Sequence, residues 1–231
     1  MKLFEIYEET MNENHVWKRL GELLSYNEPL DEGLDGGLIN LLNSAKELVF
    51  SKFKIKPEQR VYFIAGSARL YLYPDLIAEL NKRDPVNFKP HVGDLDIIIP
   101  NHMLWRNAGL EKELNSGGIY RPTGDDTIEV FDEWRPDKVK GFENSDFRTQ
   151  TEIIKDLQFI DGYWFMNLKD VLDYKNVLSR PKEAELSNLI KHYESRDLSR
   201  ITKEERFGFI SEVADIIAGK YKKTRLIQKN N

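Results

Sequence analysis

Short runs of apolar residues, some alternating with polar ones, predict the strands of a β-sheet in the middle of the chain. Segments 61–67 (VYFIAGS), 94–100 (DLDIIIP) and 127–134 (TIEVFDEW) are rich in β-branched and aromatic residues, and the first two end in turn-forming residues. Segment 157–166 (LQFIDGYWFM) predicts a β-hairpin that turns at Asp161 and Gly162.

Apolar residues recur at helical spacing before, between and after these strands. The spacing predicts helices over 1–25, 38–49, 68–80, 168–174 and 186–193, with a loop over 27–37. The first is broken near Asn12 to Asn14, and the third is interrupted by Pro74. We therefore expect an α+β fold, with a mixed β-sheet, flanking helices and a C-terminal helical region. The expected organisation is an N-terminal helical segment (1–55), a sheet-containing core (56–166) and a helical region (167–231) with a basic tail.

The composition is that of a folded protein without cysteine chemistry. Of 231 residues, 40% are hydrophobic and 32% are charged, which is ordinary for a globular chain. No apolar stretch approaches the roughly 20 residues of a membrane span, and no secretion signal opens the chain, so we expect a cytoplasmic protein with no membrane partner. Because cysteine is absent, disulfides, thiolate zinc sites and cysteine nucleophiles are excluded.

The net charge of −5 argues against a broadly basic surface that coats nucleic acid. The tail from Lys220 to Lys229 is the best local patch for binding phosphates. A solvated chain end is the simpler interpretation of such a charge run.

Two aspartates form the first candidate for catalytic chemistry. Asp94 and Asp96 lie two positions apart in a predicted strand, so their side chains share one face while Leu95 and Ile97 point to the other. Two carboxylates this close are most naturally stabilised by a divalent cation, and oxygen ligands alone suit Mg²⁺ or Mn²⁺. The alternative is a pair of solvated charges at a sheet edge, and the pattern alone does not decide between the two.

A glycine-serine turn and a third acid add to this pattern. Gly66 and Ser67 follow a buried strand and precede a helical segment, where backbone N–H groups and a hydroxyl can hold phosphate oxygens, although most such pairs are only turns. In segment 127–134, alternation places Glu129 on the face opposite Ile128 and Val130, whereas Asp132 would share their face. Glu129 is therefore preferred over Asp132 as the third carboxylate, with an ordinary solvent-facing acid as the alternative.

Together these motifs resemble those of the nucleotidyltransferase superfamily that includes polymerase beta, antibiotic nucleotidyltransferases and toxin or abortive-infection-type members. AGSARLYLY looks like the family's apolar-Gly-Ser motif, VGDLDIIIP like its paired-carboxylate strand, IEVF like its third-carboxylate strand, and residues 166–190 like the helical region that follows. The resemblance covers about residues 60–190. It implies a nucleotidyltransferase core at 56–166 and transfer of a nucleoside monophosphate from a nucleoside triphosphate to an acceptor hydroxyl, with release of pyrophosphate.

The resemblance also implies roles for individual residues. Asp94, Asp96 and Glu129 would hold Mg²⁺ or Mn²⁺ and carry the catalysis. The nucleotide would contact a second group, consisting of Gly66, Ser67, Arg69, Lys175, Arg180 and Lys182. For the basic residues of this group, the alternative is a solvated helix face or turn.

The acceptor and the biological role stay open at this level. The long interval between Ser67 and Asp94, with Pro74, Pro85 and Pro90, predicts an inserted loop that sets the chain apart from compact family members. The acceptor could be a tRNA end or other nucleic acid, a protein hydroxyl or a small molecule. The rival interpretations are a catalytically silent nucleotide-binding or regulatory protein of the same fold, and a structural protein in which the motifs are coincidental.

Overall fold

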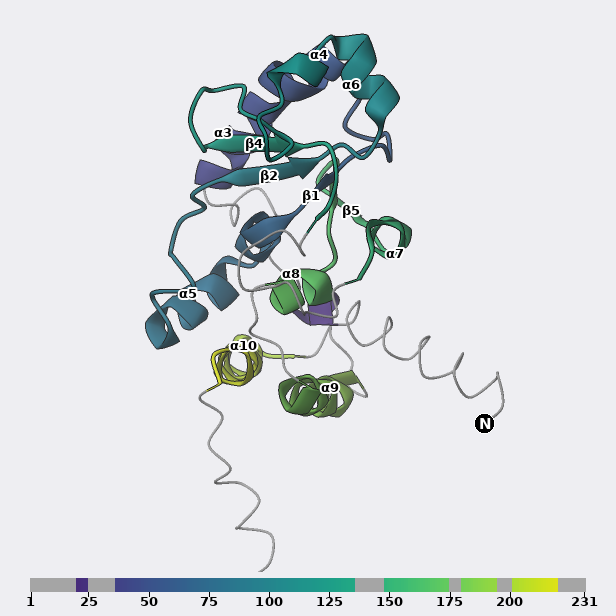
Figure 1. The fold of residues 1–231 in the computed structure, drawn as a ribbon. Coiled ribbons are helices and arrows are strands. Elements are labelled where there is room, and N and C mark those ends of the chain that lie inside the picture. The colour runs from purple at the N-terminus through teal and green to yellow at the C-terminus, as the bar shows by residue number, and fades with distance from the viewer. Residues whose placement is uncertain (1–19, 25–35, 136–147, 175–179, 195–200, 220–231) are drawn as a thin grey trace, which may run out of the picture. The chain divides into compact units, whose positions relative to one another are not determined.

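The computed structural model describes residues 20–24, 36–135, 148–174, 180–194 and 201–219 (Figure 1). Contacts divide the chain into two compact units, a sheet unit (Pro29–Pro74 and His91–Lys175) and a helical unit (Met1–Glu28, Asp75–Pro90 and Asn176–Asn231). The coarser expectation, a mixed sheet with helices, is confirmed. Within the described ranges, no helix combines the length and the apolar character that crossing a membrane requires.

The sheet unit contains a six-stranded sheet with the strand order β3-β4-β2-β1-β6-β5. Parallel pairing joins β2 to β4 and β1 to β6, and the other neighbours are antiparallel. The strands are β1 (Phe63–Ile64), β2 (Leu95–Ile98), β3 (Ile119–Tyr120), β4 (Ile128–Phe131), β5 (Gln158–Ile160) and β6 (Tyr163–Phe165). All of the predicted strands are present, but each is shorter than its apolar run. The strand β3 was not predicted.

The predicted hairpin turn is confirmed at Asp161 and Gly162. Both residues have positive φ, 50° and 84°, and they connect the antiparallel strands β5 and β6. Two consecutive residues in this left-handed region form the tight turn that matches the natural twist of a hairpin.

One face of the sheet is covered by helices. The first helical stretch consists of α3 (Gly36–Ala45), a wider π-helical turn η1 (Lys46–Phe50) and α4 (Ser51–Phe53), and α6 (His102–Ala108) packs beside α4. Trp105 of α6 lies edge-on to Phe53 at 4.8 Å and to Tyr120 at 6.4 Å, and its indole N–H donates to the carbonyl of Ile99. Because Tyr120 pairs with Val130, this is the face onto which Leu95 and Ile97 of β2 and Ile128 and Val130 of β4 project.

The remaining helices of the sheet unit are short. They are the 3₁₀-helix η2 (Gly66–Leu72), which packs against α8 (Leu168–Tyr174), η3 (Glu111–Glu113) and α7 (Gln150–Lys155). The predicted helices at 38–49 and 168–174 are confirmed, whereas α6 and α7 were not predicted.

The helical unit consists of α5 (Pro74–Arg83), α9 (Arg180–Glu194), α10 (Lys203–Ile217) and the helical residues 20–24. Helix α9 packs against α10, where the rings of Tyr193 and Phe209 lie 4.7 Å apart. The break predicted at Pro74 is confirmed, because η2 ends at Leu72 and α5 begins at Pro74, a helix position that needs no N–H donor. Three predicted segments fall on residues 1–19, 25–35 and 220–231, which are outside the described residues. They are most of segment 1–25, most of the loop at 27–37, and the basic tail.

Candidate functional site

A row of polar side chains crosses the sheet on the face opposite α4 and α6. Asp96 of β2 and Glu129 of β4 are direct partners in the parallel pair, so both side chains project from this face. Their neighbours Leu95, Ile97 and Ile128 are fully buried on the other face. Asp96 is half-buried and the Glu129 side chain is 15% exposed, so both carboxylates lie at the boundary between protein and solvent.

The turn after β1 reaches the same place. The backbone N–H of Ala65 donates to the carbonyl of Asp96 at 2.9 Å, which fixes the end of β1 beside β2. Gly66 has a φ of +66°, and a Cβ atom at this position would lie 2.4 Å from Oδ2 of Asp96. Glycine is thus favoured both by the backbone conformation and by the closeness of the carboxylate. Ser67, half-buried, follows as the second residue of η2.

Asp94 lies just before the first residue of β2 and is exposed. The next residue, Leu95, donates its N–H to the carbonyl of Thr127 at 3.0 Å. The pairing of β2 with the β4 segment therefore begins at Leu95, directly after Asp94. Among the residues that the structure describes, no three acidic or histidine side chains are grouped closely enough to hold a metal ion. The structure therefore brings Asp96, Glu129 and Gly66 together, but it does not gather Asp94, Asp96 and Glu129 into a three-carboxylate cluster.

Arg121 is a site residue that the sequence analysis missed. Its Nε donates to Oε1 of Glu129 at 2.8 Å, its Nη2 also donates to that oxygen, and Nε lies 2.8 Å from Oδ1 of Asp126. The hydrogen bond to Glu129 raises the pKa of the Arg121 guanidinium above its ordinary value. The turn-forming run from Pro122 to Asp126 was the available signal, because it places positions 121 and 129 at the two ends of a hairpin.

Asp132, the competitor of Glu129, belongs to a different turn. Strand β4 ends at Phe131, so the expected continuous strand through Asp132 does not form. A Cβ atom at Gly118, where φ is +74°, would lie 2.6 Å from Oδ1 of Asp132. The carboxylate of Asp132 thus lies against the Gly118 backbone. Because β4 ends one residue earlier, strand alternation does not determine the direction of the Asp132 side chain.

Arg69 is buried, and its contacts lie toward the other edge of the sheet. The residue is 2% exposed, its Nη2 donates to Oε1 of Gln158 at 2.8 Å, and its guanidinium lies 4.8 Å from the centre of the Tyr73 ring. Within the described part of the chain, its Nε and Nη1 have no hydrogen-bond partner. Gln158 belongs to β5, which lies on the opposite side of β1 from β2. Arg69 is therefore not part of the polar row of Asp96 and Glu129.

The remaining predicted nucleotide contacts have no described side chains. Lys175 lies outside the described residues. Arg180 and Lys182 begin α9 in the helical unit, where the backbone is described but these two side chains are not. Their roles stay predictions.

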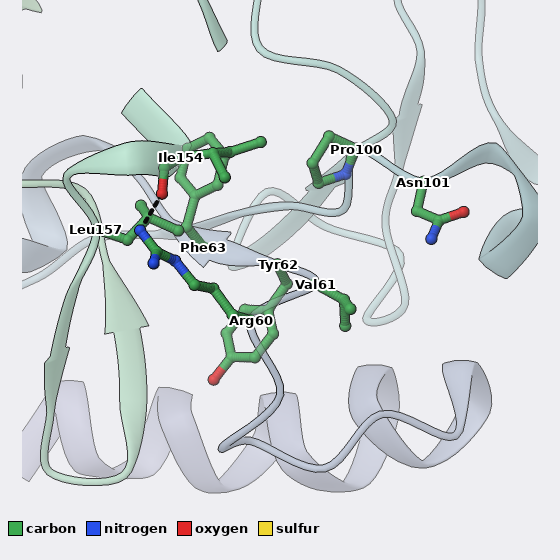
Figure 2. Close-up of a pocket in the computed structure, with 8 residues that line it drawn as sticks. All are labelled: Arg60, Val61, Tyr62, Phe63, Pro100, Asn101, Ile154 and Leu157. Atoms are coloured by element: carbon green, nitrogen blue, oxygen red, sulfur yellow. Dashed lines mark hydrogen bonds between the residues drawn. The ribbon is translucent and has the colours of Figure 1, made fainter. Parts of the chain in front are cut away.

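A pocket of about 170 Å³ opens at the other end of β1 and β2 (Figure 2). It is lined by residues 60–63, Pro100, Asn101, Ile154 and Leu157. Its two strongest polar groups already bond to backbone, since Arg60 donates to the carbonyls of Ile154 and Lys155 and Asn101 accepts from the N–H of Met103. The pocket is therefore a less suitable place for phosphate chemistry than the Gly66 turn.

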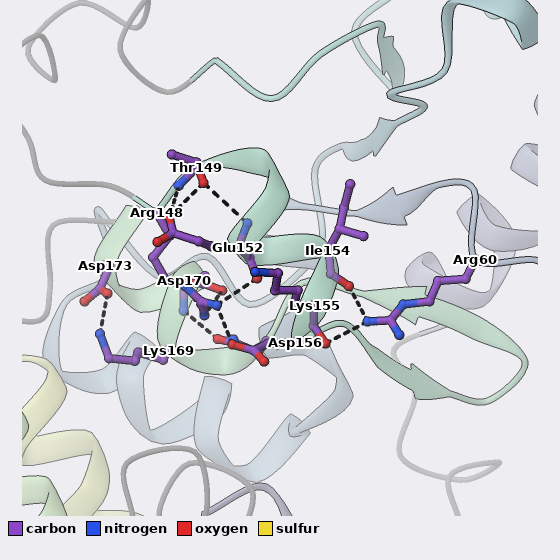
Figure 3. Close-up of polar contacts among 11 residues, drawn as sticks. Arg60, Arg148, Thr149, Glu152, Ile154, Lys155, Asp156, Lys169, Asp170 and Asp173 are labelled. Carbon is purple, nitrogen blue, oxygen red and sulfur yellow. Dashed lines mark hydrogen bonds and ion pairs between the residues drawn. The ribbon is translucent and has the colours of Figure 1, made fainter. Parts of the chain in front are cut away.

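A charged cluster joins α7 to α8 (Figure 3). Arg148 donates to the carboxylates of Asp156 and Asp170, the latter at 3.2 Å, and to the carbonyl of Glu152 at 2.8 Å. Burial raises the pKa of Asp170 to about 6, and the nearby charge of Arg148 acts in the opposite direction. This cluster connects two helices and contains no residue of the polar row.

Comparison with models of protein families, with curated proteins and with solved structures finds no match for this chain.

Proposed function

We propose that this chain is a metal-dependent nucleotidyltransferase that moves a nucleoside monophosphate from a nucleoside triphosphate to an acceptor hydroxyl. The observation that carries the proposal is the close approach of the Asp96 carboxylate to Gly66, with Glu129 in register beside it. A carboxylate pair next to a glycine-serine turn suits a divalent cation and a phosphate group together. The motif resemblance of the three segments that meet here supports the same activity.

The donor atoms fit magnesium or manganese. Mg²⁺ is usually bound through one or two carboxylates together with substrate phosphates, and Asp96 and Glu129 can supply these carboxylates, with the exposed Asp94 adjacent in sequence. A bound ion would neutralise phosphate charge and lower the pKa of the attacking hydroxyl. Gly66 is buried beside the Asp96 carboxylate, and the hydroxyl of the half-buried Ser67 that follows can donate a hydrogen bond to a phosphate oxygen.

The reaction is an in-line displacement at phosphorus. The acceptor oxygen forms a bond to the α-phosphorus, the bond from that phosphorus to the oxygen bridging the β-phosphate breaks, and pyrophosphate leaves with the electron pair. The hydroxyl proton passes to the Glu129 carboxylate or to water. Glu129 serves as this base only when Arg121 does not occupy its carboxylate.

The test is transfer of label by the full-length chain. Each of the four ribonucleoside triphosphates, labelled at the α-phosphate, is incubated with Mg²⁺, a cell extract and the protein, and both labelled products and released pyrophosphate are measured. We expect Asp96→Asn to reduce transfer by at least about 100-fold, because it removes a charge that stabilises the transition state. Asp132→Asn is the matched control and should keep its activity. Undiminished transfer by a folded Asp96→Asn protein contradicts the proposal.

One observation favours a second candidate, a catalytically silent nucleotide-binding protein of the same fold. The carboxylate of Glu129 is already neutralised by Arg121, which leaves fewer acids available for a metal. Calorimetric titration with a nucleoside triphosphate and Mg²⁺ separates the two candidates. Binding without pyrophosphate release, in the presence of every extract tried, would support the silent protein.

A further inference from the structure

Arg121 is a cation that contacts the polar row through the carboxylate of Glu129. It stands opposite Glu129, one position beyond the paired residues Ile119–Phe131 and Tyr120–Val130 of strands β3 and β4. Arg121, directly after β3, therefore lies in one row with Glu129 of β4 and Asp96 of β2 across one face of the sheet. The row ends at the Gly66 turn, where we propose that phosphate binds.

The bonds of Arg121 leave part of its guanidinium available. Nε and Nη2 donate to Glu129, and the second carboxylate near Nε, that of Asp126, is 83% exposed and so holds the arginine only weakly. In the described part of the chain, Nη1 makes no hydrogen bond, and the Arg121 side chain is 34% exposed. A guanidinium can bind either a carboxylate or a phosphate group, in both cases through two parallel N–H donors.

We propose that Arg121 exchanges partners when nucleotide binds. In the nucleotide-free protein it neutralises Glu129, and in the complex it turns to an anionic phosphate oxygen of the nucleotide, which frees the Glu129 carboxylate for the metal ion. This inference rests on the proposed nucleotidyltransferase function. It assigns Arg121 a role in positioning the nucleotide and makes tight metal binding conditional on the nucleotide.

The exchange requires metal and nucleotide to bind cooperatively. Without nucleotide, a metal ion must displace the guanidinium from Glu129 and so binds weakly. With nucleotide bound, an ion pair between Arg121 and a phosphate oxygen replaces the lost ion pair with Glu129. Because thermodynamic linkage is reciprocal, Mg²⁺ must tighten nucleotide binding by the same factor by which the nucleotide tightens Mg²⁺ binding.

Three other arginines of the sheet unit make their contacts outside the polar row. Arg60 donates to the carbonyls of Ile154 and Lys155, and Arg148 joins α7 to α8. Arg69 is buried against Gln158 and Tyr73. Arg121 alone among these four contacts a member of the polar row.

The test measures two affinities of the full-length chain by calorimetry. Mg²⁺ is titrated alone, and a nucleoside triphosphate with an α,β-methylene bridge, which cannot be cleaved at that position, is titrated with and without saturating Mg²⁺. For Arg121→Gln we expect Mg²⁺ alone to bind about tenfold more tightly than to the wild type, since Glu129 is no longer neutralised. The analogue should bind about tenfold more weakly, and Mg²⁺ should no longer strengthen its binding.

Arg106→Gln is the matched control, because it removes an exposed charge from the last turn of α6. It should leave both affinities unchanged. If Arg121→Gln does not fold, Arg121→Lys keeps the charge without the paired N–H geometry and should shift both affinities in the same directions by smaller factors. An unchanged Mg²⁺ affinity in a folded Arg121 variant overturns the exchange. That failure is distinct from failure of the proposed function, which is decided by label transfer in Asp96→Asn.

Discussion

Gly66 is the residue at which backbone conformation and site chemistry coincide. Its positive φ alone would tolerate other residues at a cost of about 1–2 kcal/mol, but the Asp96 carboxylate also occupies the space that a side chain would need. Gly124 offers the comparison, because it has a φ of +79° and nothing lies within 4 Å of the Cβ position. A side chain at Gly124 would thus cause conformational strain only, whereas one at Gly66 would cause both strain and crowding.

We predict that Gly66→Ala loses more stability than Gly124→Ala, which should lose about 1–2 kcal/mol from strain alone. Urea unfolding of both variants measures the difference. Gly66→Ala should also weaken binding of the triphosphate analogue, since Asp96 must shift, whereas Gly124→Ala should leave it unchanged. Equal losses of stability together with intact nucleotide binding would show that the contact with Asp96 does not matter.

Part of the site could be predicted from local sequence. The alternation in 94–100 and 127–134 correctly separates Asp96 and Glu129 from their buried neighbours, because a strand has a strict two-residue period. The partner of Glu129 could not be found in this way, since β3 has only two residues and so no period. Arg69 was expected on a helix surface or at phosphate, and its burial depends on Gln158, which is distant in sequence.

At the level of elements, α7 is a six-residue helix that is fixed at both ends. At its start, Thr149 accepts from the N–H of Glu152 and the Glu152 side chain accepts from the N–H of Thr149, which forms a capping box. At its end, Arg60 binds the carbonyls of Ile154 and Lys155. A helix this short is unstable alone, so these end contacts and the buried Ile153 account for its presence.

We predict that Thr149→Ala destabilises the protein by about 1 kcal/mol, because it removes the acceptor for an N-terminal N–H of the helix. Urea unfolding is the measurement. Thr151→Ala is the control, since Thr151 is exposed within the same helix and alanine favours helix formation. A loss of stability in Thr151→Ala as large as that in Thr149→Ala would mean that the capping box has no special role.

The sequence missed α6 and α7 because neither completes enough turns to show an apolar repeat. Their start signals were nevertheless present. Asn101 precedes α6 and its side chain accepts from Met103, and Thr149 with Glu152 has the spacing of a capping box. Longer helices with several apolar positions on one face, such as the predicted 38–49 stretch, were found. For helices too short to show an apolar repeat, the cap residues are the sequence signal that indicates a helix.

At the scale of the whole molecule, protonation of buried carboxylates makes folding stability depend on pH. Asp170 of α8 is 5% exposed, and burial raises its pKa to about 6 despite the charge of Arg148. An acid whose folded pKa exceeds its unfolded value of 3.8 binds more protons in the folded state between the two values. Its contribution therefore favours the folded state at low pH and is lost as pH rises from about 4 to above 6.

Replacing Asp170 with asparagine should remove this dependence. A difference of about two pKa units corresponds to about 3 kcal/mol as an upper bound, so Asp170→Asn should be more stable than the wild type at pH 7.5 by up to that amount. The difference should shrink to near zero at pH 4, where the wild-type carboxyl is already neutral. Urea unfolding of the full-length chain at several pH values between 4 and 7.5 measures it.

Asp156→Asn provides the comparison, because it removes the other carboxylate that Arg148 binds (Figure 3). Asp156 is more accessible to solvent than Asp170, so its ion pair should contribute no more than about 1 kcal/mol, and this variant should be less stable than the wild type at pH 7.5. The two substitutions in one cluster thus have opposite expected signs. If Asp170→Asn also loses stability at pH 7.5, the attraction of Arg148 exceeds the cost of burying the Asp170 charge.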